Sequence, residues 1–266
     1  MPVKGITRYQ RLISNIANWQ EYAFRKSERN QRPLKFTTKP FPIHFEVPER
    51  LYQVFKEIFM EDFYDIDRLV KKLPEEPVII DVGANAGLFD VLIYSKIKAP
   101  TVFAYEPMPA NIEVFQKTIN DNERLSAIHL YQAAVTGTEK EFIDLYTEDT
   151  VANTVVSSVF SDFNGANSKK LQVPATSLSS IITGHELERV DLLKLDCEGS
   201  EYDIIYNTTE AVLQQVGLMV IEVHHIDDER CNLPSLDAYL QNAGYTNKIL
   251  QVQDGSFYLM AERGVR

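Results

Sequence analysis

The hydrophobic and polar positions in the second part of the chain change repeatedly between two periods. Short apolar runs rich in β-branched residues, which are typical of strands buried on both faces, occupy residues 78–82, 101–106, 127–131, 191–196 and 218–223. Residues 88–98 and 110–120 lie between such runs and carry apolar side chains at helical spacing. Strands separated by helices predict an α/β fold, a doubly wound and mostly parallel sheet with right-handed crossovers.

Weaker strand patterns complete this region. Residues 142–146 and 171–173 flank a polar loop, 147–170. Residues 245–252 and 256–260 are expected to close the chain as an antiparallel pair.

The first 74 residues have a different pattern, which predicts a helical N-terminal extension ahead of a domain over residues 75–266. Helices are expected over residues 7–27, from 48 through 58 and over 66–73, and the prolines between the first two break regular structure. Basic side chains concentrate in the first 35 residues. We expect the extension to form a lid that shapes an acceptor pocket together with loop 147–170, or a subunit contact that makes a homo-oligomer.

Composition excludes several classes of protein. The chain has 266 residues, 44% of them hydrophobic, but no run approaches the length of a transmembrane helix. The N-terminus lacks the pattern of a secretory signal, so a cytoplasmic location is expected. A formal net charge of −11 argues against nucleic acid as a partner. Cys197 and Cys231 lack metal-type spacing and are expected to be free thiols.

A glycine-rich turn follows the first strand of the predicted sheet. Gly83 and Gly87 permit backbone angles and close approaches that a Cβ would obstruct. The N–H groups at the start of the next helix suit an electronegative ligand group, and Asp81 could accept hydrogen bonds from a ligand ammonium. The ligand contacts expected here come from Asp81, Gly83, Ala84, Asn85 and Gly87.

Glu106 ends the second strand, 25 residues after Asp81. An acidic side chain at this place can bind both hydroxyls of a ribose. Pro107 and Met108 follow and are placed to lie against an adenine face. Gln132 and Ala133, after the third strand, are expected to line the opposite side.

Acidic residues gather at the ends of the fourth and fifth strands. Asp196 is expected at the tip of the fourth strand, and Glu198 and Glu201 are either site residues or ordinary helix-start acids. Glu222 and His224, predicted to share a face of the fifth strand, are expected at the same end of the sheet. His224 could be a general base, a metal ligand or a structural residue. In the metal alternative, Asp196, Glu222 and His224 would hold a divalent cation such as Mg²⁺.

Taken in order, these segments resemble the FkbM family of methyltransferases. The resemblance covers roughly residues 55–245 and is most specific in the Leu-Lys-Leu-Asp-Cys-Glu-Gly block over residues 193–199. It implies the seven-stranded sheet of class I methyltransferases and methyl transfer from S-adenosylmethionine, mostly to oxygen. It places cofactor contacts on Asp81, Gly83, Asn85 and Glu106, and a central role on Asp196. Tyr64 is expected to cover the cofactor.

The expected function is therefore O-methylation of a sugar or natural-product hydroxyl, with a small molecule or glycan as acceptor. Asp196, Glu222 and His224 are the expected catalytic residues. N-methylation of a small-molecule amine and non-catalytic nucleoside binding remain the alternatives. A nicotinamide-dependent oxidoreductase should show a Gly-x-Gly-x-x-Gly turn, and this sequence does not.

Overall fold

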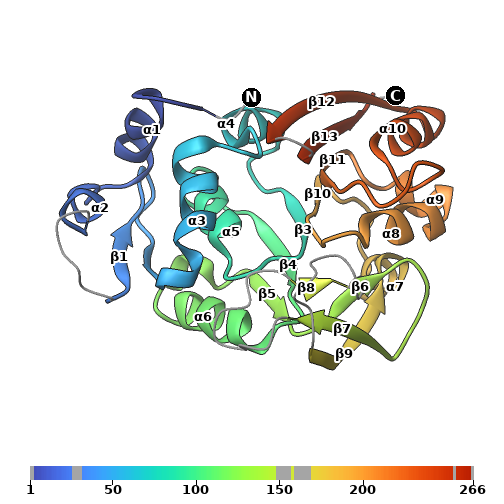
Figure 1. Ribbon diagram of the computed structural model, residues 1–266, viewed down its shortest axis with the longest axis horizontal. Coiled ribbons are helices and arrows are strands. Elements are labelled where there is room, and N and C mark those ends of the chain that lie inside the picture. Colours follow the sequence, from blue (N-terminus) through green and yellow to red (C-terminus); the bar gives the residue numbers. More distant parts are fainter. Residues whose placement is uncertain (1–2, 26–31, 148–156, 159–168, 254–255, 265–266) are drawn as a thin grey trace.

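The computed structural model describes residues 3–25, 32–147, 157–158, 169–253 and 256–264. Its centre is a seven-stranded sheet with strand order β12-β13-β11-β10-β3-β4-β5 (Figure 1). The strands from β11 through β5 are parallel, while β13 pairs antiparallel with both β11 and β12. The bounds of this sheet are β3 Val78–Val82, β4 Thr101–Tyr105, β5 Ile128–Tyr131, β10 Leu192–Leu195, β11 Leu218–Val223, β12 Tyr245–Gln253 and β13 Ser256–Arg263. The predicted α/β fold is confirmed.

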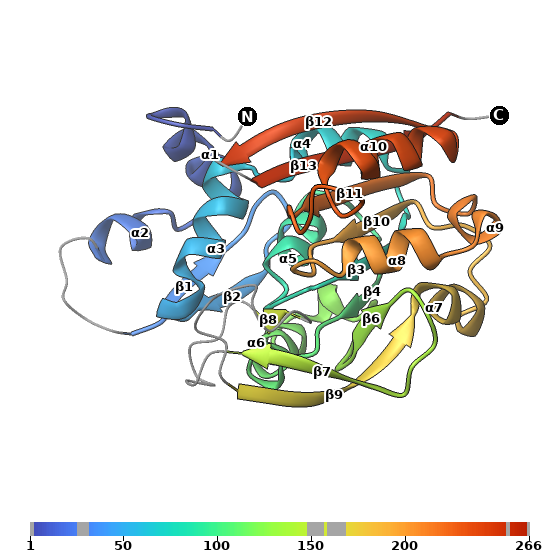
Figure 2. The ribbon, with the colours of Figure 1, turned by 45° about the vertical axis from the view of Figure 1, so that its right-hand side comes forward.

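The sheet separates two hydrophobic cores because successive side chains of a strand point to opposite faces. Ile79 and Leu192 belong to one core, whereas Ile80 and Leu193 belong to the other. The first core is covered by α5 Leu88–Tyr94 and α6 Pro109–Asn120, followed by the short η3 Glu123–Leu125. The second is covered by α7 Leu178–Gly184, α8 Glu201–Asn207, α9 Glu210–Leu213 and α10 Leu233–Asn242 (Figure 2).

The N-terminal extension packs on the face that carries α5. It contains α1 Thr7–Asn15, α2 Gln20–Arg25, β1 Leu34–Thr37, β2 His44–Val47, η1 Glu49–Leu51, α3 Tyr52–Lys56, η2 Glu57–Glu61 and α4 Ile66–Lys72. Phe36, Phe55 and Phe59 stack in series, with ring centroids 4.5 and 5.0 Å apart. This series ties β1 to the π-helical turn η2, which in turn contacts α5. The expected subunit contact through these helices stays a prediction.

Two details of the extension differ from the sequence prediction. The helix expected over 7–27 is interrupted, because Ile16 is extended and bridges to Thr38. The proline-bounded segment forms a hairpin rather than irregular structure, since Leu34 and Phe36 on β1 alternate inward and pair with Val47 and Phe45 on β2. Burial of alternate apolar side chains explains both strands.

A second sheet, of order β6-β9-β7-β8, flanks the end of β5 (Figure 1). Its strands are β6 Ala134–Thr136, β7 Phe142–Thr147, β8 Ser157–Ser158 and β9 Lys169–Ser177. The two weak strands predicted near residues 142 and 171 are therefore present, in this sheet rather than the central one. Most of loop 147–170 lies outside the described residues. Within the part of the chain that the structure describes, no helix is long and apolar enough to cross a bilayer.

Candidate active site

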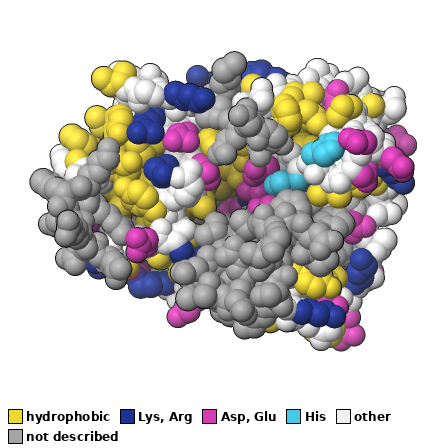
Figure 3. Space-filling model, in the orientation of Figure 1, with side chains coloured by type: hydrophobic (Ala, Val, Ile, Leu, Met, Phe, Trp, Pro, Cys, Tyr) yellow, Lys and Arg dark blue, Asp and Glu magenta, His cyan; other side chains and the backbone are white. Residues whose placement is uncertain are grey.

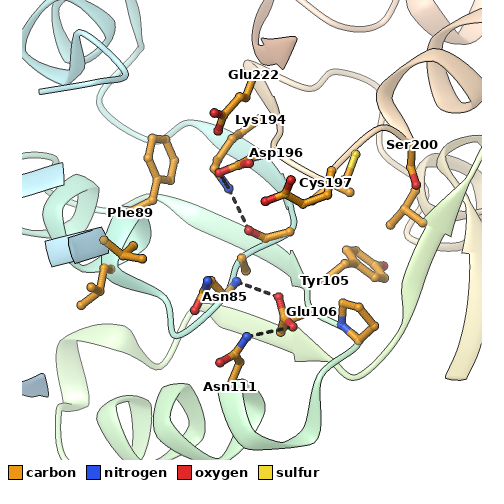
Figure 4. A pocket seen from close by; sticks show the side chains of 18 of the residues that line it. Asn85, Phe89, Tyr105, Glu106, Asn111, Lys194, Asp196, Cys197, Ser200 and Glu222 are labelled. Carbon is orange, nitrogen blue, oxygen red and sulfur yellow. Dashed lines mark hydrogen bonds and ion pairs between the residues drawn. The ribbon is translucent and has the colours of Figure 1, made fainter. Parts of the chain in front are cut away.

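A cavity of about 480 Å³ opens at the carboxyl ends of the parallel strands (Figure 4). Its walls come from the segments that follow β3, β4, β5 and β10, and from η1, α3 and η2 of the extension. Acidic side chains gather near the middle of the face that Figure 3 shows. The expected site residues in the lining are Gly83, Ala84, Asn85, Glu106, Pro107, Ala133, Asp196, Glu222 and Tyr64.

Gly83 brings the turn after β3 against the end of β10. Its φ is +77°, and a Cβ at this position would lie 1.8 Å from the carbonyl oxygen of Asp196. Only glycine allows this approach at a positive φ. Gly87, also at positive φ (+75°), does not line the cavity: a Cβ there would meet the ring of Phe115 at 2.2 Å. Gly87 therefore serves helix packing rather than the ligand contact that we expected.

Asp81 lies behind this turn, fully buried, and is not among the residues that line the cavity. Lys194 Nζ donates to Asp81 Oδ1 at 2.8 Å and to the Gly83 carbonyl at 2.9 Å. Burial alone would lower the pKa of Lys194, but the charges of Asp81 and Asp196 outweigh it and raise that pKa. Asp81 thus binds the ammonium group of Lys194, which in turn holds the carbonyl of Gly83 in the turn.

Glu106 occupies the other end of the cavity and is 5% exposed. Its carboxylate accepts from the backbone N–H of Asn85 at 2.9 Å, the N–H of Met108 at 2.9 Å and Asn111 Nδ2 at 3.2 Å. Arg50 in turn donates to Asn111 Oδ1 at 2.6 Å. Burial raises the pKa of Glu106, and these three donors oppose the shift. The carboxylate is held rigidly at the rim.

The apolar wall beside Glu106 differs in part from the prediction. Pro107 and Ala133 line the cavity, but Met108 packs into a small separate core with Leu145 and Val173, and Gln132 is not in the lining. In this position Met108 does not reach the cavity wall, where we expected it to lie against an adenine face. Ala134, Val135, Ile143 and Leu145 of the second sheet complete this wall instead.

Four side chains meet at the opposite end of the cavity. Tyr64 donates to Asp196 Oδ2 at 2.5 Å, and Tyr258 donates to Glu222 Oε2 at 3.2 Å. Asp196 and Glu222 also share a hydrogen bond between their carboxyl groups. Burial and the charge of Asp196 raise the pKa of Glu222 well above its ordinary value. Of the two carboxyl groups, Glu222 therefore holds its proton to higher pH than Asp196.

Asp196 is the ionised member of this group. Burial alone would raise its pKa, but Lys194, 3.8 Å away, and the hydrogen bonds from Glu222 and Tyr64 outweigh burial and lower it. The cavity therefore has a fixed negative charge at this end, next to the Gly83 turn.

His224 does not line the cavity. Its Nδ1 lies 3.0 Å from Glu201 Oε1, and its Nε2 lies 3.3 Å from Glu198 Oε2. Burial would lower the pKa of His224, but the hydrogen bond and charge of Glu201, with the charges of Glu198 and Glu222, raise it to about 10. An imidazolium has no lone pair to accept a proton, so this geometry argues against a general base at His224.

The expected metal site also finds no support. Asp196 and Glu222 contact each other, but His224 turns to Glu201. Across the ranges with described coordinates, no group of three or more His, Cys, Asp or Glu side chains is arranged to hold a metal ion.

Three lining residues were not predicted from the sequence: Arg50, Gln53 and Glu57, which reach the cavity from the extension. Glu198, for which the sequence left open a site role or a helix-start role, lines the cavity from the segment after β10. The extension residues lie on a helical stretch that the apolar pattern did predict, yet that pattern identifies only the buried face.

Comparisons with known proteins agree with this architecture. A family model described as the methyltransferase FkbM domain matches residues 81–246. Methyltransferase sdnD of Sordaria araneosa is 27% identical over 219 residues, which cover 72% of this chain and 81% of that protein. The 31-O-demethyl-FK506 methyltransferase FkbM of Streptomyces tacrolimicus is 25% identical over 77% of this chain and 84% of its own. The hexuronic acid methyltransferase AglP of Haloferax volcanii is 19% identical, with 80% and 83% covered.

Proposed function

Because the chain belongs to the FkbM family of methyltransferases and is an S-adenosylmethionine-dependent enzyme, we propose that it methylates a hydroxyl group of a sugar or natural-product scaffold. The names of two relatives support a sugar or natural-product acceptor: one is a 31-O-demethyl-FK506 methyltransferase and the other a hexuronic acid methyltransferase. The observation that carries the proposal is the cavity with a carboxylate at each end.

The residues present fit S-adenosylmethionine. Gly83 leaves open a turn that any Cβ would close. Glu106 would accept hydrogen bonds from the ribose hydroxyls, and the apolar wall that includes Pro107 and Ala133 would contact the adenine. Asp196 would attract the cationic amino acid end, since opposite charges favour each other strongly in a buried site. When bound, S-adenosylmethionine supplies an electrophilic methyl group.

The chain's own residues then have to orient the acceptor and keep water out. Tyr64 closes one side of the cavity, where it is 6% exposed and contacts Phe89 edge-on at 5.2 Å between ring centroids. Positioning of this kind is worth roughly 7–11 kcal/mol of a reaction barrier. We propose that the N-terminal extension, which contributes Arg50, Gln53 and Glu57 to the wall, acts as a fixed lid.

Calorimetry tests the cofactor. We expect S-adenosylmethionine and S-adenosylhomocysteine to bind with micromolar affinity and NAD not to bind. Absence of heat with both sulfur compounds, for protein shown to be folded by circular dichroism, would reject the proposed function.

A radiolabel assay tests the acceptor. Protein and methyl-tritiated S-adenosylmethionine are incubated with methyl β-D-glucuronoside, a hydroxylated macrolide and a matched set of primary amines. Label in the first two supports O-methylation. Label in the amines alone would replace it with N-methylation.

A further inference from the structure

Glu198 stands out in the segment that joins β10 to α8. Glu198 lines the cavity, and its side chain is 24% exposed. Its φ is +52°, a left-handed value that is uncommon for a residue with a side chain, and Gly199 follows at +101°. Such strained positions cost about 1–3 kcal/mol and concentrate at functional sites. This turn places Glu198 among the residues that line the cavity.

A series of charged side chains, Glu198, His224 and Glu201, holds this carboxylate. Glu198 Oε2 is 3.3 Å from His224 Nε2, and His224 Nδ1 is 3.0 Å from Glu201 Oε1. Glu201 is fully buried and also accepts from the N–H of Gly199 at 2.8 Å and from the N–H of His224 at 3.0 Å. Three nitrogen atoms, from Gly199 and His224, therefore contact the Glu201 carboxylate. The series resembles an acid–imidazole–acid arrangement in which the outer acid faces the ligand.

We propose that Glu198 is the catalytic base that takes the proton of the acceptor hydroxyl, and that His224 and Glu201 are positioning residues. This inference rests on the proposed function. The acceptor oxygen forms a bond to the donor's methyl carbon, and the carbon–sulfur bond breaks with its electron pair on sulfur. The acceptor proton moves to a Glu198 carboxylate oxygen, which leaves a methyl ether, a neutral thioether and a carboxylic acid.

The charges around Glu198 suit this role. The pKa of Glu198 is raised to about 7, because burial and the charges of Asp196 and Glu201 raise it more than the charge of His224 lowers it. A base whose pKa lies near the working pH is the most efficient proton acceptor. Asp196 is less suitable because its pKa is lowered, and Glu222 because its pKa is raised well above the ordinary value. Glu57, whose pKa burial also raises, is the rival across the cavity.

A direct titration tests the inference without any acceptor. Protein labelled with ¹³C at the glutamate carboxyl carbons is saturated with S-adenosylhomocysteine, and the Glu198 signal is assigned as the one missing from Glu198→Gln. We expect its midpoint near pH 7. His224→Gln removes the neighbouring cation, so the midpoint should move upward by about one unit or more. If His224→Gln does not fold, the wild-type midpoint alone decides, and a value below about 5 overturns the inference.

The rate test uses methyl β-D-glucuronoside or whichever probe wild-type protein methylates. Glu198→Gln should lower kcat by about 10²–10⁴-fold, with the Kd for S-adenosylhomocysteine within about threefold of wild type. The rate should rise with pH through about 7 in wild type, because only the carboxylate accepts a proton, and Glu198→Gln should lose that rise.

The matched control is Glu186→Gln. Glu186 is an exposed glutamate whose φ of +53° matches that of Glu198, and it is not among the residues that line the cavity. We expect it to keep full activity. The inference is overturned if Glu198→Gln keeps the kcat of wild type, or if Glu57→Gln loses the pH-dependent rise in rate instead. In either case, methyl transfer by the wild-type protein still upholds the proposed function. If wild type binds no S-adenosylhomocysteine, the proposed function itself fails.

Discussion

The two ends of the cavity hold carboxylates in opposite surroundings. Glu106 accepts from two backbone N–H groups and from the amide of Asn111, so its hydrogen-bond partners are donors from the nearby chain. At the other end, Asp196 meets Glu222, which is itself an acid, and Glu198 lies near both Asp196 and Glu201. Figure 4 shows the separation: Asp196 and Glu222 lie in the upper part of the view, while Glu106 lies beside Asn85 and Asn111 lies beneath it.

The difference indicates a division of labour. A carboxylate surrounded by N–H donors keeps one charge and one orientation, which suits the recognition of fixed hydroxyl groups. Carboxyl groups crowded together cannot all ionise, so their pKa values separate. The pKa of Glu222 is raised well above its ordinary value, that of Asp196 is lowered, and that of Glu198 is raised to about 7. Opposite surroundings therefore produce a binding end and a proton-handling end in one cavity.

Substituting Gly83 would break this separation and have the largest effect. In Gly83→Ala the new Cβ would meet the Asp196 carbonyl, and the positive φ adds strain. We expect a loss of about 3 kcal/mol or more in the free energy of unfolding, measured in urea. Gly184→Ala is the control, because Gly184 has nothing within 4 Å of its Cβ position and an ordinary φ. Equal stability of the two variants would contradict the close approach.

Glu106→Gln tests the binding end. A glutamine must turn an NH₂ group toward at least one of the N–H donors that now face the carboxylate. Hydrogen bonds to charged groups are worth about 1.5–3 kcal/mol, so the calorimetric Kd for S-adenosylhomocysteine should rise about 10–100-fold. Glu113→Gln, on the exposed side of α6, should leave it unchanged. An unaltered Kd in Glu106→Gln would remove Glu106 from the nucleoside contact.

Glu222→Gln sharpens the contrast with the smallest expected effect. Because the raised pKa of Glu222 favours its protonated form, a glutamine keeps both the donor to Asp196 and the acceptor for Tyr258. We expect cofactor affinity and kcat to change by less than about threefold. Asp196→Asn removes a real charge and should weaken binding more. A larger loss in Glu222→Gln than in Asp196→Asn would show that the proton resides on Asp196.

The sequence predicted much of the sheet because its strands are apolar on both faces. Buried strands such as 78–82 and 218–223 require continuous hydrophobic runs, and these are visible in the chain. The β1–β2 hairpin was missed because its inward positions, such as Leu34 and Phe36, are few and lie between prolines. Short strands of this kind show too little alternation to outweigh a breaker.

The site was predicted in position but less well in orientation. Strand alternation placed His224 beside Glu222, yet β11 ends at Val223 and alternation no longer applies one residue later. His224 could therefore turn to Glu201. Lys194 and Asp81 occupy the same register on adjacent strands, so two buried, opposite charges could have been matched from sequence. The pKa of Glu198 could not, since it depends on three charged neighbours from different elements.

The left-handed backbone at Glu198 has a practical consequence for engineering. Glycine or asparagine would adopt that conformation with less strain than glutamate, so a screen that ranks variants by melting temperature alone would favour them at this position. Such a screen would discard the carboxylate while reporting an improved protein. Thermostabilised versions of this chain should therefore be assayed for turnover from the first round of selection.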